Sequence, residues 1–186
     1  LWIKERINSQ STLVLVPSLS LLSQTLREWT FASKESFDVL CVCSDETVGK
    51  KSSYDPIMQS VHDLPFPGRS DVEKIRQFLQ GKGSKVIFST YHSSPLIAES
   101  QNDSKTTMFD LVIADEAHRC SGEAGSAFTA VLDDSLIKSK KRLFTTATPK
   151  TYTANLKKNA EERGVEISGM DDEDVFGKVF YSLPLS

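Results

Sequence analysis

The sequence predicts an α/β fold in which helices cover both faces of a mostly parallel, twisted sheet. Short apolar, β-branched runs alternate with segments of helical periodicity, and this alternation is typical of parallel strands joined by crossover helices. The length of 186 residues suits a single domain, and 39% apolar residues suffice to cover a sheet on two sides. We therefore expect one compact α/β unit.

Five strands and two helices are expected in chain order. The expected strands are the apolar runs at residues 12–16, 37–43, 85–90, 109–114 and 141–147. Residues 20–29 form the first helix, with Ser18 or Ser20 as its cap, and one face of it carries Leu21, Leu22, Thr25, Leu26 and Trp29. The second helix covers residues 71–80 and ends at the glycines that follow it, Gly81 and Gly83.

The remaining stretches set the expected boundaries of the domain. Residues 44–70 are polar, rich in Ser, Asp, Pro and Gly, and weakly periodic, which predicts a long excursion from the sheet. We expect a domain over residues 1–174 and, over 175–186, a closing strand and the lead into a second domain. The apolar run at 178–183 fits either that edge strand or that lead.

Bulk properties exclude several classes of protein. A net charge of −3 and a pI near 5.7 argue against a broad basic surface for nucleic acid, so any such contact should be local. The sequence has no run of 18 apolar residues and no secretory leader, which predicts a soluble, cytoplasmic protein. Its three cysteines are too few and too irregular for a disulfide framework and should be reduced thiols without a catalytic role: Cys41, Cys43 and Cys120.

The stretch "IADEAHRC" places Asp115 and Glu116 directly after the fourth expected strand, at the edge of the sheet where open α/β folds bind ligands. Two such carboxylates can divide the work of phosphoryl transfer: Asp115 holds Mg²⁺ through water, and Glu116 orients and deprotonates the attacking water. For two carboxylates alone, an acidic helix cap is the simpler explanation. The segment "TTATPK" (145–150) changes that balance, because it brings the hydroxyls of Thr146 and Thr148 to the same edge.

These motifs, in this order, resemble the first motor domain of superfamily 2 helicases and translocases. "VPSLSLLSQT" (16–25) resembles motif Ia of that family, "IFSTYHS" (87–93) a motif Ib or Ic region, "DEAH" (115–118) motif II and "TATP" (146–149) motif III. The resemblance covers nearly the whole chain, and the surroundings of motifs II and III are most similar to helicase subunits of restriction enzymes, including single-chain type I systems. It implies a RecA-like three-layer sandwich and ATP-dependent movement on nucleic acid, with DNA as the favoured partner.

The resemblance also implies roles for single residues. Asp115 would serve the Mg²⁺ ion, Glu116 the hydrolytic water, and His118 would connect the nucleotide site to motif III or to a second RecA-like domain. Coupling of the nucleotide state to the grip on nucleic acid would fall to Thr146 and Thr148. Two groups would touch the nucleic-acid backbone: Pro17, Ser18 and Gln24, and Ser89, Thr90 and Tyr91. Packing beneath its own loop is an equal alternative for Tyr91.

A P-loop, G-x-x-x-x-G-K-[ST], which would hold the β- and γ-phosphates of ATP, is absent from the sequence. "QGKGSK" (80–85) and "VGKKSS" (48–53) fail this pattern and are expected to be loops. "LWIKERI" (1–7) resembles the end of the helix that follows the P-loop, so we expect the chain to start just downstream of that motif in a longer protein. Losing three or four phosphate contacts would cost about 5–10 kcal/mol, so the isolated fragment is expected to be inactive.

Two other functions fit parts of the pattern. The parent protein could use this fold as a catalytically inactive scaffold or nucleic-acid-binding module, and the sequence upstream of Leu1 would separate this from a motor. A metal-dependent hydrolase built on Asp115, Glu116 and His118 would need further ligands. His62 and His92 are expected in loops that do not converge on these residues.

Overall fold

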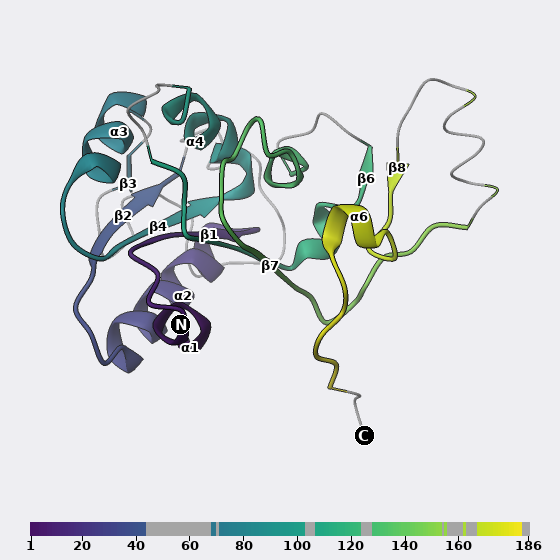
Figure 1. Ribbon diagram of the computed structural model, residues 1–186, viewed down its shortest axis with the longest axis horizontal. Coiled ribbons are helices and arrows are strands. Elements are labelled where there is room, and N and C mark those ends of the chain that lie inside the picture. Colours follow the sequence, from purple (N-terminus) through teal and green to yellow (C-terminus); the bar gives the residue numbers. More distant parts are fainter. Residues whose placement is uncertain are drawn as a thin grey trace.

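The computed structural model describes residues 1–43, 68–69, 71–102, 107–123, 128–153, 155, 162 and 167–183. Its centre is a six-stranded sheet in the order β3-β2-β4-β1-β5-β7 (Figure 1). All five neighbouring pairs are parallel, which confirms the expected fold class. The strands are β1 Ser11–Val16, β2 Asp38–Val42, β3 Gly68–Arg69, β4 Lys85–Thr90, β5 Leu111–Asp115 and β7 Arg142–Thr145.

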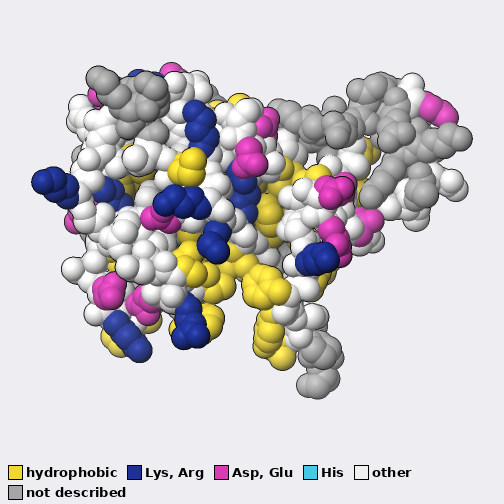
Figure 2. All heavy atoms as spheres, in the orientation of Figure 1, with side chains coloured by type: hydrophobic (Ala, Val, Ile, Leu, Met, Phe, Trp, Pro, Cys, Tyr) yellow, Lys and Arg dark blue, Asp and Glu magenta, His cyan; other side chains and the backbone are white. Residues whose placement is uncertain are grey.

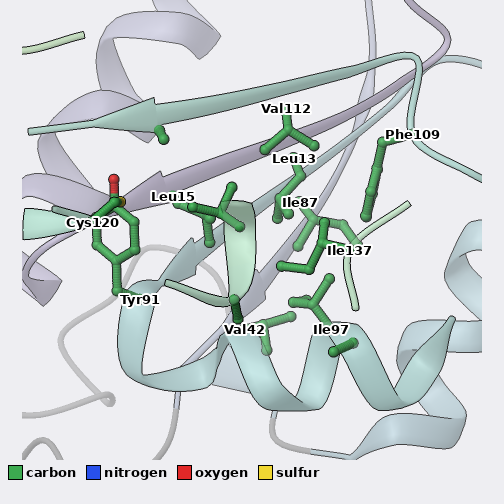
Figure 3. Close-up of a cluster of buried hydrophobic side chains, with 14 of the residues drawn as sticks. Leu13, Leu15, Val42, Ile87, Tyr91, Ile97, Phe109, Val112, Cys120 and Ile137 are labelled. Carbon is green, nitrogen blue, oxygen red and sulfur yellow. The ribbon is translucent and has the colours of Figure 1, made fainter. Parts of the chain in front are cut away.

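Helices cover both faces of this sheet. One face carries α1 (Trp2–Arg6) and α2 (Leu19–Ala32), and the other carries α3 (Val72–Gln80) and α4 (Ser94–Ser100). The side chains of β1 alternate between two cores, as the period of a strand requires. Leu13 and Leu15 join the core under α3 and α4, drawn in Figure 3, whereas Val14 joins the core under α2. Burying each such side chain stabilises the fold by about 1.5–3 kcal/mol.

The predicted start of the first helix and the predicted end of the second are confirmed, whereas α2 runs to Ala32, three residues beyond its predicted end. Ser18 is the N-cap of α2, and its hydroxyl oxygen accepts a hydrogen bond from the backbone N–H of Leu21 at 3.3 Å. Asp71 caps α3 in the same way, through the N–H of Glu73 at 3.0 Å. Gly81 follows the last residue of α3. Local side-chain chemistry therefore fixes where these helices begin and end.

One part of the chain lies mostly outside the described residues and differs from expectation where it is described. Most of the excursion at 44–70, including His62 and the 48–53 loop, lies outside the described residues, but Gly68–Arg69 adds the unexpected edge strand β3 beside β2. A two-residue strand carries no alternation, so the sequence could not signal it. The three cysteines are free thiols, as expected, and all three are buried.

The last described part of the chain packs beside motifs II and III. β6 (Gly122–Glu123) pairs antiparallel with β8 (Ile167–Ser168), and α6 (Glu173–Phe176) sets the ring of Phe176 5.1 Å from that of Phe144. The closing strand expected over 175–186 does not form in its described residues, which leave the domain with exposed apolar side chains at Val179, Phe180, Tyr181 and Leu183. Their role as the lead into a second domain stays a prediction. No helix of the described residues is long and apolar enough to cross a bilayer.

Candidate functional site

The candidate site begins where β5 and β7 end side by side at the carboxyl edge of the sheet. Parallel pairing places Asp115 opposite Thr145, and the Thr145 hydroxyl donates a hydrogen bond to Asp115 Oδ1 at 2.8 Å. Within the described residues, no other group donates to this half-buried carboxylate. The described residues therefore leave its second oxygen able to accept hydrogen bonds or to face a hydrated cation.

Glu116 follows in a backbone conformation that only a few non-glycine residues adopt. Its φ of 51° and ψ of 45° are left-handed, which costs an L-residue with a side chain about 1–2 kcal/mol. The turn continues into a three-residue 3₁₀ helix, Ala117–Arg119, whose first turn is closed by the N–H of Arg119 on the carbonyl of Glu116 at 3.0 Å. The Glu116 side chain makes no cap hydrogen bond to this helix. An acidic helix cap therefore does not explain the acid pair.

His118 joins the two motifs. Its Nδ1 lies 3.2 Å from Glu116 Oε2 and 3.0 Å from the hydroxyl oxygen of Thr146, with the hydroxyl oxygen of Thr148 at 3.4 Å. The backbone N–H of Thr148 donates to the Thr146 hydroxyl at 3.1 Å, which holds the second motif in a tight turn. Thr146 and Thr148, which are 28 and 30 residues from His118 in sequence, thus both contact the same imidazole nitrogen.

The residues expected to touch nucleic acid fall into two classes. Pro17 and Ser18 follow β1 at the same edge as the site and are half-buried, and Gln24 is exposed on α2, where its amide donates to Glu28. Their contact with nucleic acid stays a prediction. The second group is buried: Ser89, Thr90 and Tyr91 are each at most 1% exposed. The expectation that these three side chains touch a nucleic acid is therefore corrected, because packing closes them off from any ligand.

Two residues gained roles that sequence reasoning did not assign. Thr145 was expected only as part of a strand, yet its hydroxyl binds Asp115. The available signal was register, since neighbouring parallel strands that end together place their last side chains opposite each other. Tyr91 packs beneath its loop, and its hydroxyl donates to the carbonyl oxygen of Asp115 at 2.7 Å. The sequence left that alternative open.

Other candidates do not reach the site. The 80–85 loop ends α3 before β4 begins, so it lies at the opposite, amino edge of the sheet; there the Lys85 ammonium donates to the carbonyls of Gly81 and Gly83. His92 is exposed and packs its ring edge-on to Phe128. In the described part of the chain, no cluster of three or more His, Cys, Asp or Glu residues could hold a metal ion. This finding leaves the metal-dependent hydrolase without a ligand set there.

Comparisons with known proteins identify the family. A family model described as "Type III restriction enzyme, res subunit" matches residues 2–151, which include both motifs. The chain belongs to this family. The probable helicase A859L of African swine fever virus is 35% identical over 150 residues in the isolates Pig/Kenya/KEN-50/1950 and Tick/Malawi/Lil 20-1/1983, a match that covers 80% of this chain. The chain spans 15% of the length of these relatives.

Solved structures agree with this assignment. A nuclease-deletion mutant of the Type ISP restriction-modification enzyme LlaGI, in complex with a DNA substrate mimic, superposes with a TM-score of 0.65 at 33% identity, over 91% of this chain and 13% of that one. The ATP-dependent Type ISP restriction-modification enzyme LlaBIII, bound to DNA, superposes with a TM-score of 0.66 at 34% identity. This match covers 92% of this chain and 11% of that one. The expected RecA-like fold and the similarity to restriction-enzyme helicase subunits are confirmed.

Proposed function

We propose that the chain forms part of the first RecA-like domain of an ATP-dependent DNA helicase or translocase in a restriction-modification enzyme. The observation that carries the proposal is the junction at His118, where a carboxylate of the first motif and a hydroxyl of the second lie 3.2 and 3.0 Å from the same nitrogen. Such a junction lets a change at the hydrolytic site move the second motif, which a motor requires and a passive scaffold does not.

Asp115 and Glu116 divide the chemistry. In hydrolysis the oxygen of a water forms a bond to the γ-phosphorus, the bond to the bridging oxygen of ADP breaks, and Glu116 accepts the proton of that water. Asp115 fits a Mg²⁺ ion held mainly through water, because it is a single half-buried carboxylate with one oxygen left open by the described residues. When bound, the ion neutralises charge that develops on the phosphates. The left-handed backbone of Glu116 supports this role, since such strain gathers at active sites.

The remaining parts of the motor come from outside this chain in the proposal. The sequence has no P-loop, so a phosphate-binding lysine and backbone cradle must come from another segment of the protein, and an arginine finger from a second RecA-like domain. The isolated chain is accordingly proposed to be inactive. These requirements agree with the length of the relatives, of which the chain spans only a small share.

DNA is the proposed nucleic acid because both similar solved structures are DNA complexes. Pro17, Ser18 and Gln24 are the proposed contacts on this chain, at or near the carboxyl edge of β1, beside β5 in the sheet. Contacts of this type position a phosphate backbone and read no sequence. A cytoplasmic location is proposed with this role, where DNA, ATP and reduced thiols occur together.

The test is DNA-stimulated ATP hydrolysis by the complete protein that contains these residues, comparing wild type with Glu116→Gln. The substitution keeps the shape of the side chain and removes its ability to take a proton, so stimulated turnover should fall at least about 100-fold. Glu99→Gln, on the exposed surface of α4, is the matched control and should match wild type. Absence of turnover in the wild type would favour the inactive scaffold or nucleic-acid-binding module instead.

A further inference from the structure

Tyr91 lies in the interior of the domain and reaches the main chain of the candidate site. Its side chain is fully buried, and its hydroxyl donates to the carbonyl oxygen of Asp115 at 2.7 Å across 24 residues of sequence. In Figure 3 the ring rises from the segment after β4, with Cys120 beside its hydroxyl. A buried hydroxyl that donates to the peptide between Asp115 and Glu116 is in a position to control the turn that follows.

The surroundings hold this tyrosine in one orientation. Its ring stacks on Phe128 with centroids 5.2 Å apart, and the neighbouring His92 packs edge-on to the same ring at 5.0 Å. Burial raises the pKa of the Tyr91 hydroxyl, and the Cys120 thiol and the Asp115 carboxylate raise it further. Burial also raises the pKa of Cys120 to about 12. The ring stacking and the hydrogen bond to the Asp115 carbonyl together fix the position of the hydroxyl.

The carbonyl of Asp115 fixes the entry to the turn. The orientation of this peptide sets where the left-handed Glu116 begins, and Glu116 holds that conformation against a cost of about 1–2 kcal/mol relative to ordinary backbone. Strained backbone persists only where its surroundings over-determine it. Two hydrogen bonds restrain the backbone of Glu116. Before Glu116, Tyr91 donates to the carbonyl of Asp115, and after it, the N–H of Arg119 donates to the carbonyl of Glu116.

We propose that Tyr91 is a positioning residue for ATP hydrolysis, which holds the Asp115 carbonyl and thereby aims the Glu116 carboxylate at the attacking water. This inference rests on the proposed function. It also assigns a distinct task to the segment after β4, whose side chains are buried and so do not contact a ligand. The hydroxyl is the part of Tyr91 that matters, because the ring alone would fill the same space without fixing the peptide.

The test uses Tyr91→Phe in the complete protein, which keeps the ring and its stacking on Phe128 and removes only the donor. We expect kcat for DNA-stimulated ATP hydrolysis to fall about tenfold, the size expected when one hydrogen bond that positions a catalytic group is lost. The KM for ATP and the number of sites that bind a non-hydrolysable ATP analogue should stay at the wild-type values. His92→Ala, which removes the other ring on Phe128 without touching Asp115, should keep the wild-type kcat.

A merely structural role would give a different pattern. A fall in kcat matched by an equal loss of analogue-binding sites, or a wild-type kcat in Tyr91→Phe, would overturn the proposal. If Tyr91→Phe is not recovered folded, Phe128→Leu serves as the second variant, because it removes the ring on which Tyr91 stacks. Phe128→Leu should lower kcat and leave KM unchanged. A wild-type kcat in Phe128→Leu would also overturn the proposal. An inactive wild type would instead overturn the proposed function, so the two failures are distinguishable.

Discussion

The two ends of β5 each carry an aspartate, and the two are held in opposite ways. Asp110, just before the strand, accepts hydrogen bonds from the backbone N–H groups of Gln10 at 2.9 Å and Ser11 at 3.1 Å, and from the Lys140 ammonium at 2.6 Å. Burial alone would raise the pKa of Asp110, but these three donors lower it. The side-chain carboxylate of Asp115, at the end of the strand, receives one hydrogen bond from the described residues, from the hydroxyl of Thr145.

The difference separates a structural carboxylate from one available to a ligand. Asp110 links the start of β5 to the start of β1. Three donors of the protein already bind its carboxylate, so the carboxylate has little capacity left to bind a ligand. Asp115 sits at the edge where strands of open α/β sheets present their ligand-binding residues, with acceptor capacity in reserve. The comparison predicts that changes around Asp115 alter chemistry, whereas changes at Asp110 alter stability.

His118→Ala is the prediction with the larger expected effect, and it tests whether the carboxyl edge works as a unit. Removing the imidazole separates Glu116 from Thr146, so stimulation of ATP hydrolysis by DNA should fall about tenfold, within the range of typical coupling free energies. Steady-state turnover of the complete protein with and without DNA measures it. His92→Ala is the matched control and should keep wild-type stimulation. Wild-type stimulation in His118→Ala would contradict the view that the groups at the carboxyl edge act as a unit.

Thr145→Val is expected to have a smaller effect and sharpens the comparison at Asp115 itself. The valine keeps the volume of the side chain and removes the donor to Asp115 Oδ1. We expect turnover to fall about threefold, with a higher Mg²⁺ requirement, because water replaces much of the lost hydrogen bond. A Mg²⁺ titration of turnover measures both. Thr145→Ser restores the hydroxyl, and a serine variant that behaves like valine would show that the hydroxyl does not act on Asp115.

The sequence predicted the fold and the two motifs at 115–118 and 146–149, because the signals for both lie in short stretches of neighbouring residues. Five strands and the helices α2 and α3 followed from periodicity and caps, whereas α4 (Ser94–Ser100) did not. Asp115, Glu116 and the threonines stood directly after apolar runs that had to end at one edge. The Tyr91 side chain could not be placed, since its burial depends on Phe128 and Cys120, which join it only in the folded chain. The left-handed turn at Glu116 was equally hidden, because no glycine marks it.

The measurement that tests the account most directly compares Asp115→Asn with Asp110→Asn in the complete protein, each measured for turnover and for the opening free energy of β1 and β5 by amide hydrogen exchange. For Asp115→Asn we predict at least about 100-fold lower turnover, with an opening free energy within about 0.5 kcal/mol of wild type. For Asp110→Asn we predict a loss of about 1–2 kcal/mol in opening free energy, with turnover per folded molecule unchanged. Destabilisation by Asp115→Asn with turnover intact would contradict the account.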